Sequence, residues 1–512
     1  MARRKNPREW RHLGAHSRFK KEPSEIFTRT YYRPIIERTK PLYYACSLVN
    51  LAHMVMVVEE GIIARGKGAK ILEIMLEVDE MGSTGFPFEE GKGNIYLNME
   101  SYLLEKLGED LGGWAYIGRS RLDYEATIRR IYVRDELVKV IKGIVKLIGV
   151  MLRRAAEQSN TIMPGYSHLQ HSQPCTFGHY VLAFVDAFLK DIERLKGAFG
   201  RTDLNPMGAA AAAGEALGLN RKRTTELLGF SDFLENSREA CFSRDYAAES
   251  YGCCSIFMSN LGQLAMDLDL FCTQEFNMIE LADEYSGTSS FMPQKKNPLP
   301  LEAIRAYSGY FIGVLPSVLG VMKANSEEVD IIEFTPDFDL GAFQMLADMA
   351  ELMGGVMTTM NTREETMRER AYSHWSTASA LALLISREAN LSWRTAHRVV
   401  GRLVRDCVNH GIAPLQVTEE MLRKAAEEIA GEKLRLKIST EGMRKVLDPG
   451  HFIATRSTRG STNPKEVKRM VRDRAARLDQ ESQWIEGKEA HISNAYDTLR
   501  RTARKNAQGN RA

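Results

Sequence analysis

Apolar residues recur every three or four positions along most of the chain, which is the period of an amphipathic helix. The stretch LVKVIKGIVKLIGVMLRR, which begins at residue 137, shows this period over its whole length. Its basic residues fall between the apolar positions, which are Leu137, Ile141, Ile144, Ile148 and Leu152. One face of this helix is therefore expected to be buried against other helices.

Two further stretches, residues 247–272 and 341–360, keep the same period and are too long for strands. Neither has the turn residues of a hairpin, and strict alternation of apolar and polar residues is scarce throughout. The methionine-rich stripe near residues 345–360 is interpreted as core filler on a bundle helix rather than as a soft ligand surface. The sequence predicts an all-α fold with a central bundle of long helices.

Glycine-rich and charged segments divide this pattern into three expected domains. GEDLGGWAYIG (residues 108–118) precedes the long helices, and NTREETMRERAYSHWST (residues 361–377) introduces shorter ones. We expect an N-terminal helical domain at residues 1–112, a central bundle at 113–364 and a small helical domain at 365–512. From about residue 465 the chain is charged and poor in large apolar residues, which predicts a solvated helix with a frayed basic tail.

Composition narrows the classes of function. The 69 lysines and arginines nearly balance the 66 aspartates and glutamates, so no nucleic-acid partner is expected. The sequence contains no uncharged apolar run of about 18 residues, and its basic start does not lead into the apolar core of a secretion signal. The seven cysteines form no CxxC pair, and the histidines show no metal-ligand spacing. We expect a cytoplasmic small-molecule enzyme with no membrane contact and with neither a metal nor an organic cofactor.

The stretch YSGTSSFMPQKKNPLPLE, residues 285–302, concentrates polar residues between apolar segments. Gly287 predicts a mobile loop whose backbone approaches a ligand closely. Lys295 and Asn297 are hydrogen-bond donors without an acidic neighbour in sequence. An isolated pair of lysines is more often a solvated surface turn, but the composition of the whole stretch favours an anion-binding lid.

The segment MPQKKNP resembles the signature of the fumarase and aspartase superfamily, and the longer stretch ELADEYSGTSSFMPQKKNPLPLE is most similar to its argininosuccinate lyase branch. Further similar blocks follow the expected order within residues 25–470: GRSRLDYEATIRR (118–130), MPGYSHLQHSQP (163–174), CFSRDYAAE (241–249), and two C-terminal blocks at 376–401 and 447–467. The resemblance implies a three-domain, all-α homotetramer in which three chains build each active site. It also implies elimination of an amine or a hydroxyl from a succinyl group, with release of fumarate.

By this resemblance Ser289 takes the position of the general base, which removes a proton from carbon next to a carboxylate. The charge that then builds on the carboxylate needs fixed donors, and Lys295 and Asn297 meet that need. A serine hydroxyl ionises only where cations, backbone amides and exclusion of water stabilise its alkoxide. His168 matches the site histidine and Glu302 the glutamate that hydrogen-bonds to it, so His168 either protonates the leaving amine or holds a carboxylate.

The resemblance also assigns the residues that bind the succinyl part of the substrate. They are Ser120, Arg121, Ser167, Ser290, Asn297 and Arg244. Arg121 offers a planar fork to a carboxylate. Arg244 is open to a second interpretation, an ion pair with Asp245 or with another acidic residue of a helix.

Several positions depart from the branch, mostly on the side of the leaving amine. They are Thr30, Pro34, Asn94, Tyr96, Leu122, Leu319, Ala324 and Glu327. Leu122 replaces an asparagine, and Glu327 stands where the branch has a lysine. A substrate carboxylate here would lose hydrogen bonds and meet a like charge, at a cost of roughly 2 kcal/mol or more for each unmatched group. Argininosuccinate is therefore not the expected substrate, and a cationic or neutral amine without a carboxylate arm is expected instead.

Three functions are open on the sequence alone. The first is a carbon–nitrogen lyase that reversibly forms fumarate and an amine from an N-substituted aspartate or a related succinyl compound. The second is a carbon–oxygen lyase or a cycloisomerase of the same superfamily, which keeps the base but changes the bond. The third is a non-catalytic descendant like the lens crystallins of this branch. Retention of Ser289, Lys295 and His168 argues against the third, and the loss of asparagine at Leu122 argues for it.

Overall fold

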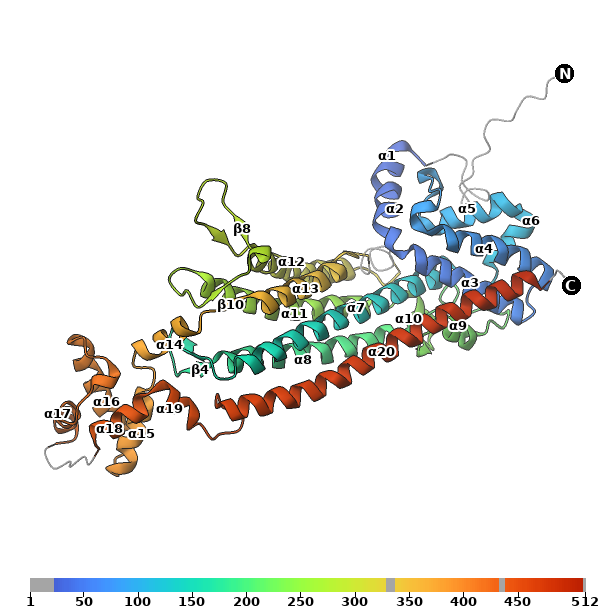
Figure 1. Cartoon of the computed structure of the whole chain (residues 1–512). Helices are drawn as coiled ribbons and strands as arrows, with labels where there is room; N and C mark the ends of the chain where they lie inside the picture. The colour runs from blue at the N-terminus through green and yellow to red at the C-terminus, as the bar shows by residue number, and fades with distance from the viewer. Residues whose placement is uncertain (1–22, 328–336, 432–437, 510–512) are drawn as a thin grey trace, which may run out of the picture.

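The chain folds into an elongated and almost entirely helical structure (Figure 1). The computed structural model describes residues 23–327, 337–431 and 438–509, so the basic start of the chain and its last residues lie outside the description. Within these ranges every strand is two residues long. The predicted all-α fold class is confirmed.

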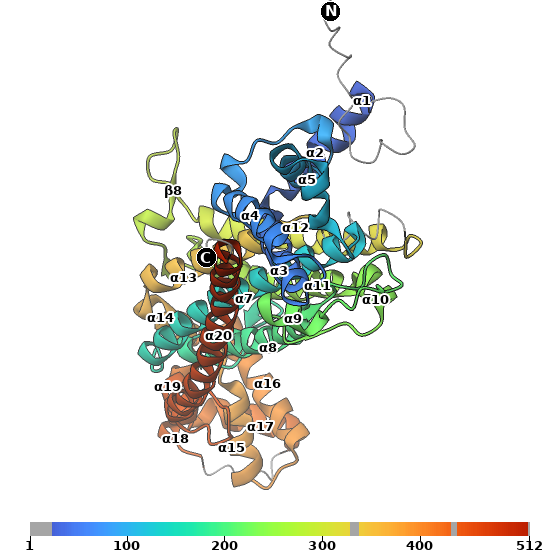
Figure 2. The same cartoon turned by 90° about the vertical axis from the view of Figure 1, so that its right-hand side faces the viewer.

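The central bundle contains α7 (Arg121–Glu157), α8 (Phe177–Thr202), α11 (Asp245–Cys272), α12 (Leu299–Met322) and α13 (Ala342–Thr359). These helices run side by side between the two ends of the molecule (Figure 1, Figure 2). The apolar positions predicted from residue 137 onward face the core, since Leu137, Ile141 and Ile148 are fully buried. The methionine stripe of α13 is core, as predicted, because Met353 and Met357 are also fully buried.

Helix α7 begins at a capping box. Ser120 Oγ accepts a hydrogen bond from Leu122 N at 3.3 Å, and Ser120 N donates to Asp123 Oδ1 at 3.0 Å. The second oxygen of Asp123 accepts from Gly208 N at 3.0 Å and from Ala210 N at 2.9 Å. Burial raises the pKa of Asp123 to about 6, against the effect of these three donors. The carboxylate therefore fixes the start of α7 and the loop at residues 208–210 together.

The N-terminal helices cover one end of the bundle (Figure 1). They are α1 (Glu25–Phe27), the π-helical turn η1 (Thr28–Tyr32), α2 (Arg33–Thr39), η2 (Lys40–Leu42), α3 (Tyr43–Glu59), α4 (Arg65–Gly85), η3 (Glu90–Lys92), α5 (Ile95–Leu107), α6 (Glu109–Gly112) and η4 (Gly113–Tyr116). Helix α3 is buried over most of its length and shares one hydrophobic core with the bundle. The predicted boundary after residue 112 falls between α6 and η4.

Shorter helices with a separate hydrophobic core lie at the opposite end of the bundle. The elements of this core are α15 (Ala378–Glu388), α16 (Trp393–Asn409), η7 (Pro414–Gln416), α17 (Glu419–Ala430) and α18 (Thr440–Leu447). Helix α14 (Glu364–Ser373) precedes them and contributes Met367 to the main core, and α19 (Pro449–Ala454) follows them. The predicted boundary after residue 364 falls at the start of α14.

The last helix, α20 (Pro464–Gln508), returns along the bundle to the N-terminal helices (Figure 1, Figure 2). It packs against α7, α4 and α3, and its residues Ile485, Ile492 and Leu499 are buried in the main core. The solvated helix predicted here is therefore solvated on one side only. Its buried apolar residues also include Val467, Met470 and Ala503, so one face of the helix is apolar within a charged sequence.

Short turns and hairpins connect the helices of the bundle. Between α7 and α8, β1 (Ile162–Met163) pairs with β4 (Cys175–Thr176), and β2 (Tyr166–Ser167) pairs with β3 (Gln170–His171). Between α8 and α11 lie β5 (Leu204–Asn205), α9 (Arg221–Leu227), β6 (Asp232–Phe233) and α10 (Ser237–Phe242). After α11, β7 (Ile279–Glu280) pairs with β10 (Asn361–Thr362), η5 (Asp283–Tyr285) follows β7, and β8 (Gly287–Thr288) pairs with β9 (Lys296–Asn297). The β8/β9 hairpin projects away from the helices (Figure 1, Figure 2).

Within the described residues, two segments are long and apolar enough to cross a membrane by length and composition alone: Glu25–Glu59 and Leu299–Met322. The apolar window of the first is 89% buried, so the core accounts for its composition. The window of the second, which is α12, is only 28% buried. Much of the apolar surface of α12 is therefore open in the single chain.

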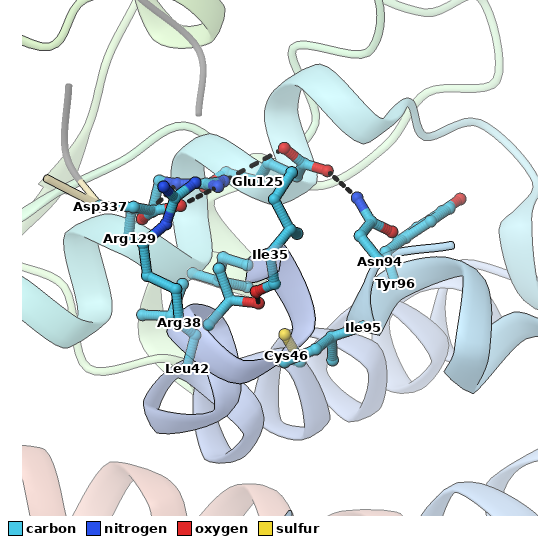
Figure 3. Close-up of a pocket in the computed structure, with 12 residues that line it drawn as sticks. Ile35, Arg38, Leu42, Cys46, Asn94, Ile95, Tyr96, Glu125, Arg129 and Asp337 are labelled. Carbon is cyan, nitrogen blue, oxygen red and sulfur yellow. Dashed lines mark hydrogen bonds and ion pairs between the residues drawn. The ribbon is translucent and has the colours of Figure 1, made fainter. Parts of the chain in front are cut away.

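A buried ion-pair cluster joins α7 to the segment before α13 (Figure 3). Arg129 donates from Nε and Nη2 to the carboxylate of Asp337 at 2.8 and 2.6 Å, and from Nη1 to Glu125 at 3.1 Å. Glu125 also accepts a hydrogen bond from Asn94 Nδ2 at 3.1 Å. The three charged side chains are at most 5% exposed, and burial raises the pKa of Asp337 while Arg129 opposes that rise. Loss of one partner would leave a buried charge uncompensated.

We predict that Arg129→Met destabilises the fold by about 3–5 kcal/mol, because Asp337 is then buried without its partner. The apparent melting temperature, followed by circular dichroism, should fall by several degrees. The control is Arg33→Met, which breaks an exposed ion pair with Glu90 and should change the melting temperature little, because water screens such pairs. Equal shifts for the two variants would contradict this account of the cluster.

Candidate active site

A cavity of about 520 Å³ lies where the N-terminal helices meet the start of α7. Its lining combines aromatic, aliphatic and charged side chains: Phe27, Tyr31, Tyr32, Ile35, Asn94, Leu97, Ser120, Arg121, Leu122, Glu125 and Glu327. Two of the predicted substrate-binding residues, Ser120 and Arg121, therefore belong to one concave site.

Arg121 is the first residue of α7 and is exposed. It has no hydrogen-bond or ion-pair partner in the part of the chain that the structure describes. Ser120 next to it accepts within the capping box and still has a hydroxyl proton to donate. The N-terminus of α7 adds a partial positive charge at the same place. This end of the cavity is suited to a carboxylate group.

Glu125 lines both the cavity and a smaller pocket of about 20 Å³, which Figure 3 shows. Asn94 also borders both spaces, and Tyr96 lines the smaller one. Because Glu125 bonds to Arg129 and Asn94, its negative charge is compensated from within the protein.

The predicted base, Ser289, lies in the loop between β8 and β9. Its Oγ accepts hydrogen bonds from two backbone amides, Phe291 N at 3.3 Å and Met292 N at 3.0 Å. Amides directed at this oxygen stabilise its negative charge, which is the condition for a serine to act as a base. Ser290 is exposed beside it and the Phe291 side chain is 90% exposed, so water reaches this loop in the single chain.

The two lysines of the loop differ in their surroundings. Lys296 Nζ contacts Glu280 at 3.2 Å and Asp283 at 2.7 Å. Lys295 is exposed and has no ion-pair partner among the described residues. Asn297 is half-buried in β9. Lys295 is therefore the lysine of this pair that a ligand can reach.

The structure shows close packing at Gly287, and the mobility expected of this loop stays a prediction. Gly287 lies in β8 opposite Asn297, and a Cβ atom added to it would come within 2.3 Å of Leu299 Cδ1. The glycine is thus explained by close packing of the hairpin on the start of α12. The tip of the hairpin is exposed.

His168 lies at the turn between β2 and β3. His168 and Leu169 have φ values of 55° and 57°, which suit a two-residue hairpin turn, and both side chains are exposed. Ser167 is exposed at the end of β2. Glu302 is exposed in the first turn of α12, and within the described residues no hydrogen bond joins it to His168. The expected contact between His168 and Glu302 is not made within this chain.

The predicted site residues fall into two groups at opposite ends of the bundle. Arg121 lies in the first turn of α7, and the β2/β3 hairpin follows the last turn of the same helix. The 37 residues of α7 place these two ends ~55 Å apart. Helix α12 separates Ser289 from the cavity in the same way, because its 24 residues span ~36 Å between the β8/β9 hairpin and the segment that holds Glu327. One chain alone does not bring the two groups together.

Arg244 lies beneath the surface and is not among the residues that line the cavity. It is 1% exposed and donates from Nη1 to Ser243 O at 2.7 Å. Burial lowers its pKa to about 10. In this chain Arg244 is buried and does not line the cavity that contains Ser120 and Arg121.

The departures from the branch divide into two sets. Asn94, Leu122 and Glu327 line the cavity, and Glu327 forms an ion pair with Arg238. The described lining of the cavity does not include Leu319, which is half exposed on α12, or the other departures, namely Thr30, Pro34, Tyr96 and Ala324. The cavity-lining set is the one that affects a ligand directly.

Sequence reasoning missed the aromatic residues of the cavity, Phe27, Tyr31 and Tyr32. Their signal is the segment IFTRTYY, in which aromatic residues follow Phe27 at four and five positions. An ordinary α-helical period does not place residues four and five positions away equally on one face, so the pattern did not predict a cluster.

Two family profiles match the sequence. The family described as Lyase matches residues 42–313, and the family described as Argininosuccinate lyase C-terminal matches residues 375–454. The argininosuccinate lyase of Methanocaldococcus jannaschii is 34% identical over 470 residues, which cover 91% of this chain and 95% of the relative. The argininosuccinate lyase of Methanosarcina acetivorans is 36% identical, with 94% and 96% covered.

Solved structures agree with these matches. EDDS lyase in complex with formate is 29% identical, has a TM-score of 0.87, and the match covers 96% of this chain and 97% of that one. The 3-carboxy-cis,cis-muconate lactonizing enzyme from Pseudomonas putida is 15% identical with a TM-score of 0.67 over 89% of this chain and all of its own, a likeness that shows the fold alone. The chain therefore belongs to the argininosuccinate lyase branch of the fumarase and aspartase superfamily and is a carbon–nitrogen lyase that forms fumarate.

Proposed function

We propose that this enzyme reversibly eliminates an amine from an N-substituted aspartate, with Ser289 as the general base. The observation that carries the proposal is the pair of backbone amides, from Phe291 and Met292, that donate to Ser289 Oγ. The alkoxide takes a proton from carbon next to a carboxylate, and the electron pair left behind forms the carbon–carbon double bond. The carbon–nitrogen bond breaks with its electrons on nitrogen, and the amine gains a proton as fumarate forms.

The other site residues take the roles that the resemblance implies. Lys295 and Asn297 stabilise the extra negative charge on the carboxylate beside the carbanion. Ser120 and Arg121 hold the second carboxylate. His168, oriented by Glu302, protonates the leaving amine or holds a carboxylate. Supporting contacts come from Ser167, Ser290 and the buried Arg244.

We propose a homotetramer in which each active site combines residues from different chains. The separation of the two groups of site residues along α7 and α12 supports this arrangement. So do the open apolar faces of α11 and α12, on which Ile256, Met266, Ile312 and Leu319 are 43%, 56%, 59% and 50% exposed. Burial of these side chains between chains would remove apolar surface from water and so favour association.

An amine other than arginine is the proposed product beside fumarate. Leu122 offers no hydrogen bond to a ligand, and Glu327 places a carboxylate on the cavity wall, so the carboxylate arm of arginine would be unmatched there. The likeness to a variant of EDDS lyase with bound fumarate, at a TM-score of 0.87, supports fumarate as the shared part of the reaction. The relatives that are more than 30% identical favour carbon–nitrogen chemistry over the carbon–oxygen and cycloisomerase alternatives.

We expect the enzyme to act in the cytoplasm, without a metal or an organic cofactor. A serine base with fixed donors at the substrate carboxylate supplies the chemistry by itself. Across residues 23–327, 337–431 and 438–509, no group of three or more histidine, cysteine, aspartate or glutamate side chains is arranged to hold a metal ion.

We predict that Ser289→Ala reduces turnover below detection while fumarate binding, measured by calorimetry, persists. The control is Ser386→Ala, because this serine of α15 bonds to Leu391 O in the C-terminal helices and belongs to neither group of predicted site residues; it should keep most of the activity. If Ser289→Ala itself keeps more than about a tenth of the wild-type rate, it has lost less than ~1.4 kcal/mol in barrier, and Ser289 is not the base.

A complementation experiment tests the shared site. Arg121→Ala and Ser289→Ala should each be inactive, because each removes one half of every site. After dissociation and reassembly of an equal mixture, about a quarter of the sites should receive both intact residues if these come from different chains. Mixing Ser289→Ala with the double variant Arg121→Ala/Ser289→Ala is the control, since no site is then complete. Absence of recovery in oligomers verified as mixed by mass spectrometry would argue for a site within one chain.

Arginine and agmatine test the choice of amine, because they differ only in the carboxylate group. With fumarate in excess, agmatine should give product and arginine none, since the carboxylate is unmatched beside Leu122 and Glu327. Glu327→Lys should reduce the difference in product formation between agmatine and arginine, because it places a positive charge on the cavity wall. Cleavage of argininosuccinate by the wild-type enzyme with kcat/KM above ~10⁴ M⁻¹s⁻¹ would refute the proposed selectivity.

A further inference from the structure

Three aromatic side chains form a continuous wall along one side of the cavity. The ring centroids of Phe27 and Tyr31 lie 5.2 Å apart and stack at an interplanar angle of 17°. Tyr32 lies 4.9 Å from Phe27 and 5.5 Å from Tyr31. Phe27 is 42% exposed, so part of this aromatic surface is open to a ligand.

A π-helical turn places these rings together. In η1, Arg33 N donates to Thr28 O five residues earlier, instead of the usual four. The wider turn brings residues four and five positions after Phe27 to the same side of the backbone, where Tyr31 and Tyr32 stand. Such turns are uncommon and often mark functional sites.

The aromatic wall continues into an aliphatic surface. Ile35, Leu97 and Leu122 line the cavity beside it. A ligand group that lies here is removed from water by apolar side chains on several elements, namely α2, α5 and α7.

The acidic residues of the lining do not make this part of the cavity a cation site. Glu125 is bonded to Arg129 and Asn94, and Glu327 is paired with Arg238. Each carboxylate is therefore already compensated by an arginine of this chain. The anion-binding end of the cavity, at Ser120 and Arg121, is directly adjacent.

We propose that Phe27, Tyr31 and Tyr32 form the amine-side wall of the active site and select an amine that carries an uncharged aromatic ring. This inference rests on the proposed elimination reaction and names its substrate class, an N-arylalkyl aspartate. The succinyl carboxylate lies at Ser120 and Arg121, and the ring of the amine packs against the three aromatic side chains. A ring with a carboxylate would find no hydrogen-bond donor at Leu122 or at the acidic residues of the lining, and a cationic arm would gain little from carboxylates that are already paired.

The test compares three amines of similar size in the addition to fumarate, followed by loss of fumarate absorbance. Benzylamine has an uncharged ring, 1,4-diaminobutane a cationic arm and 4-aminobutanoate a carboxylate arm. The wild-type enzyme should show the highest kcat/KM with benzylamine. Phe27→Leu and Tyr31→Leu keep an apolar side chain but remove a ring, and each should lower kcat/KM for benzylamine relative to 1,4-diaminobutane by about threefold to tenfold. Trp393→Ala, at an exposed aromatic residue of α16 in the C-terminal helices, should leave this ratio unchanged.

A binding experiment separates failure of this inference from failure of the proposed reaction. In a Ser289→Ala background, calorimetry should show tighter binding of N-benzylaspartate than of N-(4-aminobutyl)aspartate, and Tyr31→Leu should remove most of that difference. If no amine reacts with the wild-type enzyme but this binding preference is found, the elimination proposal is wrong and the aromatic wall is supported. If amines react and the cationic arm is preferred, or if the leucine variants weaken all ligands equally, the aromatic selectivity is refuted. Melting temperatures within a few degrees of wild type establish that the variants are folded.

Discussion

The length of α7 is the constraint on which the arrangement of the active site depends. A continuous helix of 37 residues holds its capped start and the hairpin beyond its end ~55 Å apart, whatever the loops do. This separation offers a common explanation for three features that have no evident role in a single chain. In the proposed homotetramer, another chain would complete the site at the exposed His168 and Lys295 and would cover the open apolar face of α12. Of the predicted site residues, Ser120 and Arg121 are the ones that line the described cavity.

At the β8/β9 hairpin, backbone amides donate hydrogen bonds to the hydroxyl oxygen of the proposed base, Ser289. These amides are those of Phe291 and Met292, and the start of the hairpin packs on α12 so closely that a Cβ atom at Gly287 would meet Leu299. The loop that carries the proposed base is exposed. A serine is a strong base only where water is excluded. A bound substrate or a neighbouring chain must therefore cover the exposed tip of the hairpin before Ser289 can act as the proposed base.

The sequence predicted those features that depend on local pattern or on a specific motif. Helical periodicity was sufficient to predict α7 and α13. The segment MPQKKNP and its neighbouring blocks were sufficient to predict the family. The sequence pattern underestimated the buried face of α20, because the charged residues of this helix dominate its composition and conceal the apolar positions between them. It also missed the aromatic wall, because a π-helical turn changes which residues share a face. The contact between His168 and Glu302 was inferred from a family whose sites join several chains, and one chain does not form it.

The start of α7 shows how substrate choice and catalytic geometry are separated in this fold. Ser120 and Asp123 hold the helix terminus through backbone hydrogen bonds, and Asp123 is satisfied by three backbone amides. The side chain of residue 122 takes no part in that cap. Leu122 instead packs on a small apolar cluster around Cys241 and borders the cavity, so a change at this position alters what the cavity binds while Arg121 keeps its place. The same holds for Phe27 and Glu327, which lie on segments outside the bundle core. Selection on the amine can therefore act on these positions while the capping box and the two hairpins keep the elimination chemistry.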